Sequence, residues 1–113
     1  MNVQDIVAGL PVVVVTGKQA LTNQVTGGYT SDLLSNVMGQ ATNGNIWVTM
    51  QGHQNIAAVA SLAGLAAVVI AGGAEPAPET LQKAEQEGIV ILTTALSTFE
   101  VVGRLYEMGV RGA

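Results

Sequence analysis

The chain has 113 residues, which is enough for one domain with a single hydrophobic core. Hydrophobic residues make up 49% of it and charged residues only 11%, against roughly 25% charged in an average soluble domain, so we expect an apolar surface that favours self-association. A net charge of −4, four lysines and arginines, one histidine and no cysteine argue against nucleic-acid binding, disulfides and thiolate or histidine metal sites.

The first part of the chain is predicted to contain a helix and a strand. A short helix over 3–10 is closed by the glycine and proline at its end. The continuous β-branched run at 12–15 is typical of a strand that is buried on both faces. Residues 21–25 are predicted to form a short strand or an extended segment that leads into the next turn.

Two adjacent glycines follow at 27–28. They favour a tight or left-handed turn, which a side chain would obstruct. After this turn, Thr30 or Ser31 is expected to cap a helix over 31–41. Asp32 would then lie in the first turn of that helix, where the helix macrodipole stabilises a negative charge.

Three strands and three helices are predicted to alternate through the rest of the chain. The strands cover 46–50, 66–71 and 89–92, and the helices cover 55–62, 78–87 and 98–108. Pro78 opens the second of these helices, because its missing N–H does no harm there. Ser97 and Glu100 form a capping-box pattern at the start of the last helix.

Strands that are separated by helices of this length imply right-handed βαβ crossovers. We therefore predict a single α/β domain over 1–113, with a mainly parallel β-sheet flanked by helices. Ligands of such sheets bind beyond the carboxyl ends of the strands, near a switch in strand order. The loops at 16–18, 51–55, 72–75 and 93–97 are expected to meet at this edge, where their backbone N–H groups suit a small anion.

Two glycine motifs resemble phosphate-binding loops without matching them. The segment that ends at Gly17 and Lys18 lacks the first glycine of a P-loop. Val12 stands in that position, and Gln19 replaces the Ser or Thr that would bind magnesium. The glycine pair at 72–73 does not form a dinucleotide fingerprint either, so we interpret both motifs as turns.

The uncharged run at 56–73 is long enough to be weighed as a membrane helix. Its alanines and glycines instead favour an apolar helix, a glycine turn and a buried strand. Asp5 and the absence of a positive flank argue against a signal peptide at the N-terminus. We therefore expect a cytoplasmic protein that makes no contact with a membrane.

Three side chains have both a structural and a functional interpretation. His53, between a strand and a helix, would cap the helix, contact a phosphate, or act as an acid or base near neutral pH. Asp32, if it is more than a helix-start residue, would bind Mg²⁺ or a ribose hydroxyl. Tyr29 would pack in the core or an interface, or stack on the ring of a ligand.

Three stretches of the chain resemble the DRTGG domain family. They are Thr26-Gly27-Gly28-Tyr29-Thr30-Ser31-Asp32-Leu33-Leu34, the stretch 46–56 from Ile46-Trp47-Val48 to Gly52-His53-Gln54-Asn55-Ile56, and the stretch 97–107 that begins Ser97-Thr98-Phe99-Glu100. The resemblance covers nearly the whole chain. In the signature that names the family, Gln24 and Val25 replace the Asp and Arg, while the Thr-Gly-Gly that follows is retained.

The resemblance implies an α/β fold and a homodimer. DRTGG domains occur between CBS domains in regulated pyrophosphatases and beside phosphotransacetylase-type enzymes, and they are similar to the amino-terminal domain of HPr kinase/phosphorylase. In these settings the domain helps to dimerise or to transmit regulation, and catalysis lies elsewhere. The resemblance therefore supplies no catalytic residue.

The leading hypothesis is a non-catalytic, homodimeric regulatory or interaction module that senses a nucleotide or a phosphorylated metabolite, with no cofactor and no metal. One alternative is a small enzyme that acts on phosphate or acyl-phosphate groups through His53 and Asp32. Another is an adaptor that binds a protein partner, such as a kinase or an anti-sigma-type protein. The candidate ligand-binding residues are Thr26, Gly27, Gly28, Tyr29, Asp32, Gln51, His53, Thr94 and Ser97.

Overall fold

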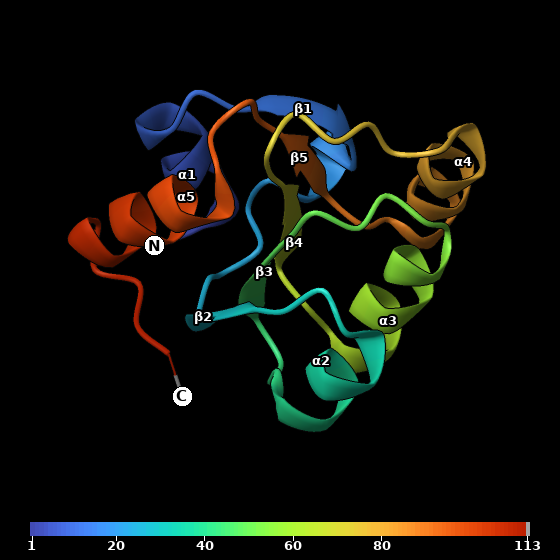
Figure 1. Cartoon of the computed structure of the whole chain (residues 1–113), viewed down its shortest axis with the longest axis horizontal. Coiled ribbons are helices and arrows are strands. Elements are labelled where there is room, and N and C mark those ends of the chain that lie inside the picture. Colours follow the sequence, from blue (N-terminus) through green and yellow to red (C-terminus); the bar gives the residue numbers. More distant parts are fainter. Residues whose placement is uncertain (113) are drawn as a thin grey trace.

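The computed structural model describes residues 1–112, in which strands and helices alternate along the chain (Figure 1). The helices are α1 (Val3–Gly9), α2 (Leu34–Gln40), α3 (Asn55–Ala63), α4 (Pro78–Glu87) and α5 (Thr98–Glu107), with a short 3₁₀ turn η1 (Lys18–Ala20). The strands are β1 (Val13–Thr16), β2 (Gly27–Thr30), β3 (Asn45–Thr49), β4 (Ala67–Ile70) and β5 (Ile91–Thr93).

The five strands form one sheet in the order β1-β5-β4-β3-β2, and β2 to β5 run parallel to one another. Because these four strands follow in sequence order, right-handed crossovers bring α2, α3 and α4 to the same face of the sheet (Figure 1). The helices α1 and α5 cover the opposite face. The predicted α/β fold with a mainly parallel sheet is confirmed, but its parallel part contains no reversal of strand order at which a crevice would form.

Strand β1 departs from the sequence prediction in its direction and its burial. It lies at the edge of the sheet and pairs antiparallel with β5. Val13 is 62% exposed, so the strand is not buried on both faces. The loop after Thr16 therefore lies at the opposite edge from the loops that follow β3, β4 and β5. A β-branched run indicates a strand but does not fix the direction in which it enters the sheet.

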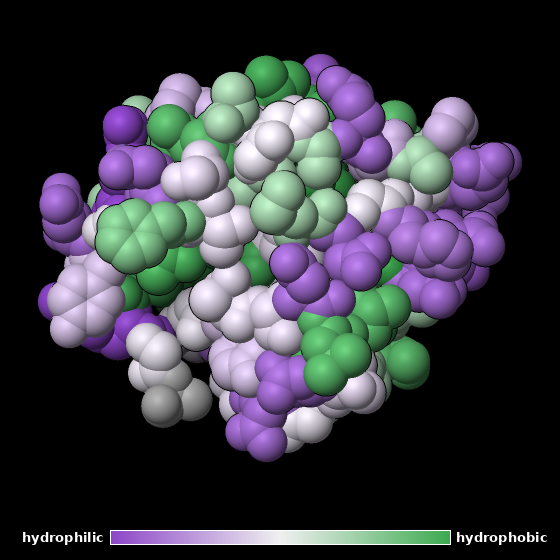
Figure 2. Space-filling model, in the orientation of Figure 1, coloured by the Kyte–Doolittle hydropathy of each residue, from purple (hydrophilic) through white to green (hydrophobic). Residues whose placement is uncertain are grey.

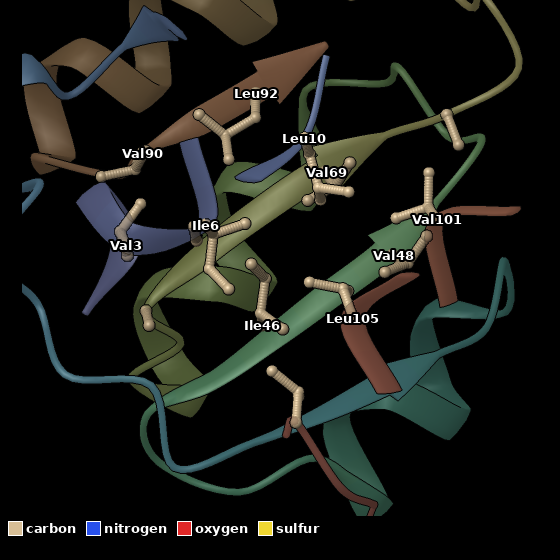
Figure 3. Packing of buried hydrophobic residues seen from close by; sticks show 14 residues of the cluster. Val3, Ile6, Leu10, Ile46, Val48, Val69, Val90, Leu92, Val101 and Leu105 are labelled. Carbon is tan, nitrogen blue, oxygen red and sulfur yellow. The ribbon is translucent and has the colours of Figure 1, made fainter. Parts of the chain in front are cut away.

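Alternating side chains of the central strands fill two hydrophobic cores. Ile46 and Val48 of β3 point toward α1 and α5, where they meet Ile6 and Leu105 (Figure 3). Trp47, between them in sequence, points toward α2, α3 and α4. The near-continuous apolar composition of β3 and β4 follows from this burial on both faces.

The predicted helix ends are largely confirmed. Pro78 stands in the first turn of α4, and Gly88 closes that helix in the left-handed conformation at φ 69°. The Ser97 hydroxyl accepts a hydrogen bond from the Glu100 N–H at 3.2 Å, as the capping pattern predicts. The run at 56–73 forms α3 and β4, and no helix within residues 1–112 is long and apolar enough to cross a membrane.

The glycines at 27–28 form strand β2 rather than a turn, and neither has a positive φ. The helix that follows begins at Leu34, so Asp32 lies before it and not in its first turn. The Ser31 hydroxyl accepts a hydrogen bond from the Leu33 N–H at 3.1 Å, but it does not cap α2. The predicted turn and helix start are therefore wrong at this point.

Candidate functional site

A groove opens between strand β2, helix α5 and the segment 110–112 that follows α5. Its volume is about 300 Å³, which is at the lower end for a site that holds a small ligand. The lining residues are Gly28, Tyr29, Thr30, Val48, Val102, Leu105, Tyr106, Val110, Arg111 and Gly112. The groove is mostly apolar, and Arg111 is the charged residue of its lining.

The two glycines of β2 are needed because another segment of backbone passes close to them. A Cβ atom at Gly27 would lie 2.8 Å from the carbonyl oxygen of Arg111. At Gly28, a Cβ would lie 3.1 Å from the Val110 side chain, and the Gly28 N–H donates to the same Arg111 oxygen at 3.0 Å. Residues 110–112 therefore run along the outer edge of β2, and the absence of a side chain at Gly28 keeps that part of the groove open.

Arg111 is held at the mouth of the groove by Tyr106. Its guanidinium carbon lies 3.7 Å from the centroid of the Tyr106 ring, in cation–π geometry. Its Nη1 donates to the carbonyl oxygens of Tyr106 and Val110. The guanidinium group is thus a positioned cation beside an apolar hollow.

Helix α5 also presents an exposed apolar face, which includes Val102 and Tyr106 of the groove lining and extends beyond the groove to Phe99. Phe99 is 86% exposed, Tyr106 58% and Val102 37%, whereas Val101 and Leu105 are buried against the sheet. Figure 2 shows hydrophobic side chains at the surface over α5. Spacings of three and four residues place the exposed three on one side of the helix, and we call them the α5 face.

The structure separates the residues that the sequence suggested as one site. Gly28 and Tyr29 line the groove. The Tyr29 hydroxyl, however, reaches α2 on the other face of the sheet, where it donates to Asn36 Oδ1 at 2.6 Å. Thr26 precedes β2, and its hydroxyl donates to the Asn43 carbonyl oxygen at 2.8 Å, away from the carboxyl edge of the sheet.

The other candidate binding residues lie at the carboxyl edge of the sheet, where they form hydrogen bonds with other residues of the chain. The Thr94 hydroxyl donates to the Pro11 carbonyl oxygen at 2.9 Å, and Ser97 caps α5. His53 Nδ1 accepts a hydrogen bond from the Asn55 N–H at 3.1 Å, at the start of α3, whose N-cap residue is Gln54. No group of acidic and histidine side chains within residues 1–112 could hold a metal ion.

Asp32 joins the end of β3 to the loop that follows β2. Its Oδ1 accepts hydrogen bonds from the Thr49 hydroxyl and the Met50 N–H, each at 2.8 Å. Gln51 adds to the same cluster, because its N–H donates to the Thr49 hydroxyl at 3.1 Å and its side-chain amide approaches the Asp32 carbonyl at 3.4 Å. The carboxylate therefore has a structural role that spacing in the sequence did not indicate.

Replacing Asp32 with alanine should lower the free energy of unfolding by about 1–2 kcal/mol, because two hydrogen bonds to a partly solvated carboxylate are lost. Asp32→Asn keeps an acceptor oxygen and should lose less than half of that amount. Urea unfolding measures both variants. An Asp32→Ala variant as stable as the original protein would contradict this structural role.

Sequence reasoning missed most of the groove. Val102, Leu105 and Tyr106 lie in the predicted last helix with no predicted functional role, and Arg111 is one of the four lysines and arginines of the chain. The groove forms when residues 110–112 fold back onto β2, a contact across about 80 positions for which local patterns give no signal. One signal in the sequence could have indicated the groove. Helix α5 carries apolar residues on two sides, whereas a helix that packs on one sheet needs them on one side only.

A four-stranded parallel array with an antiparallel edge strand, helices on both faces and a groove beside the opposite edge define a small α/β domain. The DRTGG domain model matches residues 5–108, so the chain belongs to the DRTGG domain family. This confirms the resemblance in the sequence. No curated protein sequence matches the chain.

A solved structure with the same fold is that of the CBS and DRTGG domains of the regulatory region of Clostridium perfringens pyrophosphatase, complexed with its activator, diadenosine tetraphosphate. The TM-score is 0.74 and the sequence identity 14%, a level at which the likeness shows the fold. The match covers 92% of this chain and 45% of that one, so the present chain spans less than half of the regulatory region.

Proposed function

We propose that this chain is a non-catalytic regulatory module that works as a homodimer and senses a small anionic metabolite, either a nucleotide or a phosphorylated metabolite. The observation that carries the proposal is the groove between β2 and α5, an apolar hollow with one positioned cation, Arg111, at its mouth. Membership of the DRTGG family and the regulatory region in which the similar structure occurs support it.

A non-catalytic role is supported by how the polar side chains at the carboxyl edge are used. The Asp32 carboxylate accepts two hydrogen bonds from the end of β3, and His53 Nδ1 accepts one from the start of α3. A general base needs a free lone pair directed at the proton that it removes. Asp32 Oδ1 and His53 Nδ1 direct theirs at Thr49 and at backbone N–H groups, so these two atoms have a structural use.

The α5 face supports self-association. Phe99 is 86% exposed, which is unusual for a large aromatic side chain unless it meets a partner. A twofold dimer brings the same surface of both copies together, so one apolar helix face is sufficient to form it. Among the residues described, the ion pair on α5, between Arg104 and Glu100 at 3.5 Å, lies within one chain, and the three side chains of the face carry no charge of their own, although the Arg111 guanidinium stacks on one of them.

Replacing Phe99 with glutamate should raise the dimer dissociation constant at least 100-fold, because each copy would bring a negative charge into an apolar contact. Sedimentation velocity over a concentration series measures this constant. The variant should fold normally, since the side chain makes little contact within its own chain. Leu62→Glu is the matched control, because Leu62 is 76% exposed on α3, at the opposite face of the sheet. Equal weakening by both variants would contradict the assignment of the α5 face.

The sensing role draws on the similar structure as well as on the groove. That regulatory region was solved with a dinucleotide activator, and this chain shares its fold over 92% of its own length. A thermal-shift screen of nucleotides and phosphorylated metabolites tests the role here. A ligand at 100 times its Kd adds about 2.7 kcal/mol of stability, which should raise the midpoint by roughly 10 °C.

A further inference from the structure

Arg111 supplies the positive charge of the groove lining, and the side chains around the groove add little further positive charge. Arg104, also on α5, is paired with Glu100 at 3.5 Å. Lys83 is paired with Glu87 at 3.3 Å on α4, on the other face of the sheet. The chain as a whole carries a net charge of −4. Within one chain, a polyphosphate would therefore meet one arginine in a negatively charged protein, whereas a single phosphate matches the site.

The walls of the groove are largely apolar, as a nucleobase requires. Val48, Val102 and Leu105 are apolar, and Gly28 leaves bare backbone between them. The Arg111 guanidinium stacks on the Tyr106 ring at 3.7 Å, which places its charge beside these apolar walls, where it can meet a phosphate. The volume of about 300 Å³ has room for one nucleoside rather than two.

The edge of β2 adds polar atoms beside these walls. The Gly28 N–H points away from β3 and donates to the Arg111 carbonyl oxygen at 3.0 Å. Because alternate residues of a strand direct their backbone groups to the same side, the backbone N–H and C=O of Thr30 also face outward, along the groove. The N–H can donate a hydrogen bond to a heterocycle, and the C=O can accept one from it.

We propose that this groove takes one planar heterocycle with a single phosphate, a molecule of the nucleoside monophosphate class, and that it discriminates against polyphosphates. The ring lies between Val102 and the backbone of β2, and the phosphate meets Arg111. This inference rests on the proposed sensing function and deepens it, since it names the chemical class of the ligand and the residues that hold it.

Titration calorimetry on the whole chain tests the proposal with adenosine, AMP, ATP and diadenosine tetraphosphate as probes, alongside guanosine and GMP. The monophosphate of at least one base should bind about tenfold tighter than its nucleoside, as one charge-assisted contact allows. ATP and diadenosine tetraphosphate should bind no tighter than AMP. A polyphosphate that binds at least tenfold tighter than every monophosphate would overturn the proposal.

Two variants locate the site. Arg111→Gln should reduce the affinity for the monophosphate to that of the nucleoside, while Arg104→Gln, which removes the other arginine of this region, should change neither affinity by more than twofold. Val102→Trp should fill the groove and abolish binding of both, and Leu62→Trp is its control on α3. Val102 is 37% exposed, so a larger side chain is expected to leave the fold intact, which the thermal midpoint verifies.

The outcomes separate this inference from the function on which it rests. If a polyphosphate is the tight ligand, if the thermal-shift screen finds a phosphorylated metabolite without a base instead, or if Val102→Trp leaves monophosphate binding unchanged, the ligand class or its site is wrong while the sensing function stands. If no calorimetry probe binds and the thermal-shift screen is also flat, but the dimer persists, the inference and the sensing role fail and the dimeric interaction role remains. A monomer that binds nothing contradicts both.

Discussion

Replacing Trp47 with alanine is expected to lower the free energy of unfolding by about 4 kcal/mol, within the range typical for truncating a buried tryptophan. Trp47 is fully buried in β3, in the core between the sheet and helices α2, α3 and α4. Its indole N–H also donates to the Ser31 carbonyl oxygen at 2.9 Å, which ties β3 to the loop after β2. The truncation would leave both a cavity and an unpaired carbonyl.

Thermal and urea unfolding measure this effect, and the midpoint should fall by roughly 15 °C in a domain of this size. Trp47→Phe retains a ring in the cavity but loses the indole hydrogen bond, so it should cost about 1–2 kcal/mol. If alanine and phenylalanine at this position had equal effects, the core would not depend on the bulk of the side chain as described.

Replacing Gly17 with alanine should cost about 3 kcal/mol or more, for two reasons that act together. Gly17 has φ 74°, a conformation that costs an L-residue roughly 1–2 kcal/mol. A Cβ there would also lie 2.6 Å from the Ile89 carbonyl oxygen and 2.7 Å from the Val90 Cα. The turn after β1 is pressed against the start of β5, and backbone atoms cannot move aside as a flexible side chain does.

Gly73→Ala is the matched control. Gly73 has φ 72°, and no atom lies within 4 Å of the position that its Cβ would take. It should therefore cost about 1 kcal/mol, from backbone strain alone. Urea unfolding of the two variants separates strain from collision. Equal losses would contradict the close packing of Gly17 against β5 and would allow a more open loop there.

The sequence predicted the elements that depend on neighbours along the chain. The closing glycine of α4, Gly88, and the capping serine of α5, Ser97, act within one helical turn of the residues that they serve. The buried strands were likewise visible as short apolar runs, because each presents both faces to a core. The fold class followed from their alternation with helices.

Features that depend on distant contacts could not be predicted in this way. The glycines at 27–28 favour a turn by local rules, but they lie in strand β2 and are required by the approach of residues 110–112. Asp32 was assigned to a helix start, but it binds the end of β3, 17 and 18 positions away. The direction of β1 depends on its pairing with β5, which its β-branched composition does not encode. The groove depends on the contact between residues 110–112 and β2, so the sequence predicted only part of the candidate site.

The central proposal is a homodimeric regulatory module, and its most direct test is the molar mass of the unmodified protein in solution. Light scattering on a size-exclusion column at micromolar concentration measures it without reference to shape. The proposal predicts twice the chain mass of 11.5 kDa, or about 23 kDa, as a single species. A mass of 11.5 kDa that does not change with concentration would contradict it.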